Sequence, residues 1–138
     1  MYLLDTNVIS ELRKTRSGRA DRRVVQWQAS VSNASLYVSV IAIFELEVGV
    51  LKMERRDASQ GHALRIWLDH QVLPAFEGRI LGIDSAVALR CAQLHIPDPR
   101  AEGDAMIAAT ALVHGMTVVT RNVEDFAGTG VKLINPWN

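Results

Sequence analysis

The fold is decided by the N-terminal stretch MYLLDTN (residues 1–7), in which a short apolar run meets an acid and two small polar residues. Residues 1–4 lack helical periodicity and predict a strand. Thr6 and Asn7 supply N-cap chemistry for a helix whose apolar side chains lie at positions 8, 9 and 12. The stretch therefore predicts the order strand, acid, helix, with Asp5 at the end of the strand.

The same unit recurs further along the chain. Residues 36–38 form a second short apolar run, Ser39 is another N-cap candidate, and residues 41–53 carry apolar side chains at helical spacing. Further helices are expected over residues 59–76, 84–94 and 104–114, and further strands over 80–83, 116–120 and 131–134. Strands that alternate with helices predict an α/β fold, with a mostly parallel central sheet of about five strands flanked by helices on both faces.

Length and composition indicate one domain over residues 1–138. A chain of this size that is 49% hydrophobic can form a core without disulfides. The single cysteine, Cys91, lies in an apolar helical stretch, so we expect a small buried side chain in a reducing compartment. No apolar run approaches the ~20 residues that cross a membrane, and we expect a cytoplasmic protein.

The charges balance, because 15 basic and 15 acidic side chains give no net charge. Bulk electrostatics therefore does not indicate a nucleic-acid partner. A basic cluster could still contact several phosphates, although a solvated loop and helix face is the simpler interpretation. The cluster contains one acid, Asp21, and consists of Arg13, Lys14, Arg16, Arg19, Arg22 and Arg23.

Polar residues follow several of the predicted strands. In an open parallel sheet, ligands bind in the crevice beyond the carboxyl ends of the strands. We therefore expect the residues that follow these strands, and the acid that opens a neighbouring helix, to lie at one edge. They are Asp5, Ser39, Glu45, Asp104, Thr120, Asn122 and Asp125.

This gathering of carboxylates indicates metal chemistry. Carboxylates held together repel one another, so they either raise their pKa values or recruit a cation. Mg²⁺ prefers oxygen ligands and leaves room for substrate phosphates, which predicts a phosphoryl-transfer site. The histidines lack paired ligand spacing, and no phosphate-binding Gly-rich loop or Gly-x-Ser-x-Gly elbow is present. These absences argue against zinc, nucleotide-hydrolase and serine-hydrolase chemistry.

Each candidate also has a purely structural interpretation. The helix macrodipole would favour Asp104 in a first turn, and Thr6 is an ordinary capping residue. Glu45 and Glu47 compete for the acidic position that follows the second strand. Small residues at the helical neighbour positions of Glu45 favour it slightly over Glu47.

Taken in order, four motifs resemble those of a PIN domain: LLDTN (3–7), residues 39–45, DAMIAAT (104–110) and TRN (120–122). The chain is most similar to the VapC-type toxins of bacterial toxin–antitoxin pairs, in particular to the FitB-like branch. The resemblance spans the whole chain and includes the closing NPW (135–137).

The resemblance implies a metal-dependent endoribonuclease. Asp5, Glu45 and Asp104 match the acidic metal-site positions of the family, and Thr6 matches a supporting hydroxyl. At the last acidic position this chain has Asn122, with Asp125 three residues later as a substitute. Mg²⁺, or alternatively Mn²⁺, would activate the water that hydrolyses an RNA phosphodiester, leaving a 5′-phosphate and a 3′-hydroxyl.

The resemblance also implies partners. Arg13, Arg16 and Arg121 would position the RNA backbone. The chain would form a homodimer and would bind a cognate VapB-type antitoxin, whose C-terminal segment covers the active site. DNA would be bound only through that antitoxin.

Two rival interpretations remain open on the sequence. A haloacid-dehalogenase-like phosphatase would use Asp5 as a nucleophile, but it needs a second acid where this chain has Asn7. A non-catalytic PIN-like module that binds nucleic acid or protein is left open by the departure at Asn122, although the three retained acids argue against it. Loss of metal-dependent cleavage in Asp5→Asn would distinguish an enzyme from such a module.

Overall fold

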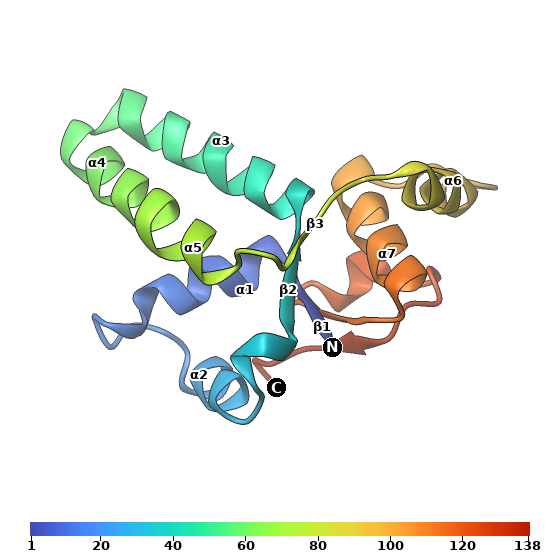
Figure 1. Cartoon of the computed structure of the whole chain (residues 1–138), viewed down its shortest axis with the longest axis horizontal. Coiled ribbons are helices and arrows are strands. Elements are labelled where there is room, and N and C mark those ends of the chain that lie inside the picture. The colour runs from blue at the N-terminus through green and yellow to red at the C-terminus, as the bar shows by residue number, and fades with distance from the viewer.

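A parallel sheet of five strands, in the order β3-β2-β1-β4-β5, forms the centre of the computed structural model, which describes residues 1–138 (Figure 1). All neighbouring strands run parallel. The predicted α/β fold with about five strands and a mostly parallel sheet is confirmed. The strands are β1 (Tyr2–Leu4), β2 (Leu36–Ser39), β3 (Ile80–Leu81), β4 (Thr117–Val119) and β5 (Leu133–Ile134).

Helices cover both faces of this sheet, as predicted (Figure 1). None of them is long and apolar enough to span a membrane. The helical segments, including short 3₁₀ turns and one π-helical segment (η3), are α1 (Thr6–Leu12), η1 (Arg13–Thr15), α2 (Arg22–Ala29), η2 (Asn33–Ser35), α3 (Val40–Arg56), α4 (Ala58–Trp67), η3 (Leu68–Val72), α5 (Leu73–Ala75), α6 (Ser85–Leu94), α7 (Glu102–His114) and η4 (Val123–Phe126).

The alternation of side chains along the strands divides the core into two layers. Leu4 and Val119 point into the layer that is covered by α1, α2, α3 and η3. Leu3 and Val118 point into the opposite layer, which is covered by α6, α7 and η4. Because successive residues of a strand face opposite sides, a central strand that is buried on both faces reads as a continuous apolar run.

Some boundaries differ from the sequence predictions. Asp5 itself caps α1, so the prediction that Thr6 and Asn7 form the cap was wrong: the helix already begins at Thr6. Helix α7 begins at Glu102, ahead of the predicted start at Asp104. The basic stretch contains an unpredicted helix, α2, capped by Asp21. The helix has an amphipathic pattern, with Val24 buried and Trp27 against the same core layer, but the arginines around it favoured a solvated segment on the sequence alone.

The order of the strands creates a crevice at one place. The chain leaves β1 for α1 on one face of the sheet, and it leaves β4 for η4 on the other face. Neighbouring connections that diverge in this way leave an opening beyond the carboxyl ends of the two strands. Asp5 follows β1 and Thr120 follows β4 at this opening.

A helical hairpin formed by α3 and α4 projects beside the sheet (Figure 1). Gly61 lets its two helices approach closely, since a Cβ atom at this position would lie 2.4 Å from the Glu54 Cα atom. Arg65 of α4 pairs with Glu47 at 2.6 Å and with Glu54 at 3.2 Å. These contacts fix the direction of α3, whose first turns carry Glu45.

Candidate active site

Asp5 is the most deeply buried acid of the site, with only 6% of its surface exposed. Its Oδ1 atom accepts a hydrogen bond from the Thr6 backbone N–H at 2.8 Å, and its Oδ2 atom accepts one from the Thr120 hydroxyl at 2.8 Å. Burial raises the pKa of Asp5, and these hydrogen bonds oppose the rise. The carboxylate is therefore held in a defined orientation at the carboxyl end of β1.

Thr120 is the centre of a polar network at the end of β4. It is fully buried, and its hydroxyl oxygen accepts hydrogen bonds from the Asn122 backbone N–H at 3.0 Å and the Asn7 side chain at 3.3 Å. Asn7 in turn accepts a hydrogen bond from the Arg121 backbone N–H at 3.3 Å. Because the hydroxyl has one proton and receives two N–H donors, that proton is directed to Asp5.

Glu45 belongs to this site and Glu47 does not. The exposed Glu45 carboxylate accepts a hydrogen bond from the Thr6 hydroxyl at 2.8 Å. A Cβ atom placed on Gly103 would lie 3.7 Å from Glu45 Oε2, so the start of α7 approaches the same carboxylate. Arg65 binds Glu47 instead and lowers the pKa of that carboxyl. The preference for Glu45 is thus supported by contacts far apart in the sequence.

Asp104 lies in the first turn of α7 and is half-buried. Burial raises its pKa to about 6, and nearby negative charges add to the rise. These charges come, in falling order, from Asp5, Asp125 and Glu45. The carboxylates therefore lie close enough to repel one another, which is the condition that favours binding of a cation.

An open cleft of about 410 Å³ gathers these side chains. Asn122 lines it, whereas Asp125 does not, although the charge of Asp125 reaches Asp5 and Asp104. The residues that line the cleft are Asp5, Thr6, Asn7, Ser10, Glu11, Lys14, Glu45, Asp104, Arg121, Asn122 and Trp137.

The donor set of this cleft suits Mg²⁺ or Mn²⁺ better than a metal that needs a closed cage. No three acidic, histidine or cysteine side chains converge as a complete ligand set. Mg²⁺ uses one or two carboxylates and keeps several waters, so an open cleft with oxygen ligands is sufficient. Asp5 and Asp104 could contribute such ligands, with Glu45 at the side of the cleft.

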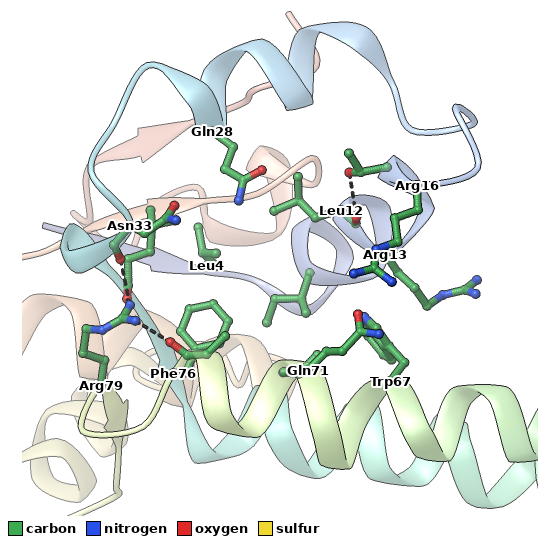
Figure 2. Close-up of a pocket in the computed structure, with 15 residues that line it drawn as sticks. Leu4, Leu12, Arg13, Arg16, Gln28, Asn33, Trp67, Gln71, Phe76 and Arg79 are labelled. Atoms are coloured by element: carbon green, nitrogen blue, oxygen red, sulfur yellow. Dashed lines mark hydrogen bonds between the residues drawn. The ribbon is translucent and has the colours of Figure 1, made fainter.

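The three arginines selected from the sequence lie in two different places. Arg121 lines the acidic cleft. Arg13 and Arg16 instead line a second cavity of about 400 Å³, which shares no lining residue with the cleft. Figure 2 shows this cavity between the α1–α2 region and the α4–α5 segment, with Arg13 beside Trp67. The structure does not bring Arg13 and Arg16 to the carboxylates.

Several lining residues had not been selected as site residues. Ser10, Glu11 and Lys14 follow Asn7 at helical spacing, and Lys14 pairs with Glu11 at 3.1 Å. Projecting the face of the first helix from Asn7 would have found them. Trp137 had no comparable signal, because its place beside Arg121 depends on the return of the chain through β5.

The parallel sheet and the acidic cleft at its switch point define an α/β domain of the PIN type. The PIN domain family model matches residues 2–131. The chain therefore belongs to the PIN domain family, and its relatives there include VapC-type toxins.

Individual relatives are similar over nearly the whole chain. The VapC ribonuclease Y4jK of Sinorhizobium fredii is 38% identical over 99% of this chain and 98% of its own length. Toxin FitB of Neisseria gonorrhoeae is 37% identical over 100% of this chain and 99% of its own length. A solved structure of FitAB bound to a DNA fragment superimposes with a TM-score of 0.88 at 36% identity, covering 100% of this chain and 96% of that chain.

Proposed function

We propose that this chain is a metal-dependent endoribonuclease that acts as the toxin of a bacterial type II toxin–antitoxin pair. The observation that carries the proposal is the meeting of Asp5, Glu45 and Asp104 at one open cleft, with the Thr6 and Thr120 hydroxyls supporting two of these acids. The names of the relatives support RNA as the substrate, since one is a VapC ribonuclease and another a toxin.

The three acids of the cleft would have two different roles, metal binding and orientation of water. Asp5 and Asp104 would hold Mg²⁺ or Mn²⁺, because burial raises the pKa values of both acids. Neighbouring negative charges add to the rise, from Asp125 at Asp5 and chiefly from Asp5 at Asp104. The bound cation would supply charge compensation for the phosphate and would activate water for hydrolysis. Glu45 is exposed and held by Thr6, which suits it to orient that water or to bind a second ion.

Basic side chains would bind the RNA on either side of the acids. Arg121 lies in the cleft itself, and Asn122 offers an amide where many PIN domains have an acid. Arg13 and Arg16 would contact the backbone further away, along the second cavity. Such contacts fix the position of the RNA without selecting its sequence.

The proposed partners follow from the relatives. The FitAB structure contains a toxin-type chain similar to this one together with bound DNA. We therefore expect a small VapB-type antitoxin that covers the acidic cleft with its C-terminal segment and carries the DNA-binding function. A homodimer of this chain, with no affinity for DNA on its own, is part of the same proposal.

The proposal is tested by cleavage of a mixed pool of structured RNA by antitoxin-free protein, with Mg²⁺, Mn²⁺ or a chelator. Asp5→Asn and Asp104→Asn should abolish metal-dependent cleavage while remaining folded. Glu45→Gln should reduce it at least tenfold, an effect of ~1.4 kcal/mol on the barrier. Glu47→Gln is the matched control, because Glu47 is bound by Arg65 outside the cleft, and it should retain activity.

Equal RNA cleavage by wild type and by the Asp5→Asn and Asp104→Asn variants would refute the proposal that this chain is an enzyme. In that case the non-catalytic module, which would bind nucleic acid or protein through the same fold, becomes the better interpretation. Cleavage that is lost equally in Glu45→Gln and Glu47→Gln would show that damage to α3, and not loss of a site carboxylate, explains the defect.

A further inference from the structure

Arg121 is a cation among acids that forms no ion pair with any of them. Its side chain lines the acidic cleft, yet it takes part in none of the ion pairs or side-chain hydrogen bonds of the chain. Instead, the guanidinium carbon lies 5.4 Å from the centre of the Trp137 ring. The indole therefore provides the one partner that the structure gives to this cation.

The C-terminal turn that carries Trp137 is fastened to the end of β4. The Thr120 backbone N–H donates to the Ile134 carbonyl at 2.9 Å, and the Asn135 side chain donates to the Arg121 carbonyl at 3.4 Å. The Trp137 backbone N–H donates to the Asn135 side-chain oxygen at 2.9 Å. These bonds set the indole beside Arg121, and residues 134–137 of the turn lie beyond the residues matched by the PIN family model.

The indole itself is buried, with 7% of its surface exposed, and it packs in the core layer of Leu4 and Val119. It is thus too enclosed to stack on an RNA base. A guanidinium that lies over an aromatic face keeps the N–H donors at its edge free, and those donors match the geometry of a phosphate. The stacking also keeps the cation from collapsing onto the carboxylates.

We propose that Trp137 is a positioning residue that holds the Arg121 guanidinium at the rim of the acidic cleft, where it binds one phosphate of a single-stranded RNA. The inference rests on the proposed function, because it takes RNA as the ligand of the cleft. The C-terminal turn thereby takes a role in substrate binding that the acidic residues do not fill.

The test measures RNA binding without cleavage. A fluorescein-labelled single-stranded RNA of mixed sequence is titrated with antitoxin-free protein in EDTA, at several salt concentrations. The plot of log K against log salt has a negative slope. Loss of one phosphate contact on a single strand lowers the magnitude of this slope by about 0.7. Arg121→Ala should show this decrease and bind about tenfold more weakly, a change of ~1.4 kcal/mol.

Variants of Trp137 separate positioning from folding. Trp137→Leu fills the core but removes the aromatic face, so it should show the same decrease in slope although Arg121 is present. Trp137→Phe retains an aromatic face and should keep the wild-type slope. The double variant Arg121→Ala/Trp137→Leu should lose no more than either single variant. Arg56→Ala, at the far end of α3 from Glu45, is the control for loss of a positive charge.

The outcomes distinguish failure of the inference on Trp137 from failure of the proposed function. If wild type binds RNA and Arg121→Ala keeps the full slope, the inference fails and the proposed function stands. If Arg121→Ala lowers the slope but Trp137→Leu does not, Arg121 binds RNA without help from Trp137, and the inference also fails. If wild-type protein binds no RNA in EDTA at any salt concentration, the inference fails, because Arg121 then holds no phosphate by itself. The proposed function is decided separately, by the metal-dependent cleavage test.

Discussion

The hydroxyl of Thr6 donates a hydrogen bond to Glu45 Oε1 at 2.8 Å, although 39 positions separate the two residues in the chain. The bond connects the first turn of α1 to α3. Glu45 is exposed and no cationic side chain is paired with it. The direction of its carboxylate therefore depends on this one hydroxyl.

Thr6→Val should impair catalysis without unfolding the protein. It removes the bond to Glu45 but leaves the capping of α1 by Asp5, which uses the backbone N–H of residue 6. We expect kcat to fall about tenfold, the effect of losing one hydrogen bond of ~1.4 kcal/mol. Thr6→Ser retains the hydroxyl and should keep most of the activity; equal loss in both variants would contradict an orienting role.

Thr120→Val should weaken both the fold and the binding of metal. The substitution nearly preserves shape but leaves the Asp5 Oδ2 atom with only the longer bond from the Asn7 side chain, at 3.4 Å, and the Asn122 N–H without its acceptor. Buried polar groups that lose a partner cost about 1–3 kcal/mol. Urea unfolding measures this loss, and titration with Mn²⁺ by electron paramagnetic resonance measures affinity. Thr120→Ser should be close to wild type in both measurements.

The contribution of Asp104 to the stability of the metal-free protein should fall as the pH rises from about 4 to 7. Burial and neighbouring acids raise the pKa of Asp104 from 3.8 to about 6. The folded state therefore binds this proton more tightly than the unfolded state, and the resulting stabilisation is present below pH 4 and lost as the pH passes 6. Asp5 acts in the same direction, since its pKa is also raised.

Asp104→Asn tests this dependence. In EDTA at pH 7 it should raise the free energy of unfolding by about 1 kcal/mol, after allowance for solvent screening of a half-buried group. At pH 4 the variant and wild type should be nearly equal. Asp98→Asn, in the exposed loop between α6 and α7, is the control for removal of a charge. The deciding quantity is the free energy of unfolding of wild type minus that of Asp104→Asn. If this difference increases from pH 4 to pH 7, the assigned repulsion is wrong.

The strands and most helices were predictable because their signals are local. Residues 1–4 read as an apolar run since β1 is buried on both faces, and Gly115 ends α7 in the left-handed conformation expected of a C-cap. The choice between Glu45 and Glu47 was not local. It depends on Arg65, which lies 18 residues from Glu47 and reaches it only because α3 and α4 form a hairpin.

The positions of the arginines also could not be predicted from local sequence signals. No local pattern separates Arg13 and Arg16 from Arg121 as contacts of the cleft, but α1 carries the first two away from the carboxylates toward the second cavity. Trp137 reaches Arg121 through the pairing of β5 with β4. Contacts of this kind follow from the order of strands in the sheet, which local periodicity does not specify.

Gly61→Ala should destabilise the hairpin that positions Glu45. The new Cβ atom would lie 2.4 Å from the Glu54 Cα atom, and backbone cannot yield as a flexible side chain does. Overpacking of this kind costs about 1–3 kcal/mol. Gly49 of α3 is the matched control: nothing lies within 4 Å of its Cβ position, and Gly49→Ala should stabilise the protein by ~0.5–1 kcal/mol. Chemical denaturation of the two variants should give changes of opposite sign.

Substitutions of Asn122 and Asp125 should have different effects on catalysis, because only Asn122 lines the cleft. Asn122 lines it, so Asn122→Ala should lower kcat/KM, whereas Asp125 lies outside and acts on Asp104 through its charge. Removing that charge in Asp125→Asn lowers the pKa of Asp104, and the acidic limb of the pH–rate profile should move to lower pH with little change in the plateau. A collapse of the plateau in Asp125→Asn would instead show that Asp125 enters the site when metal and RNA are bound, as the substitute for the acid that Asn122 replaces.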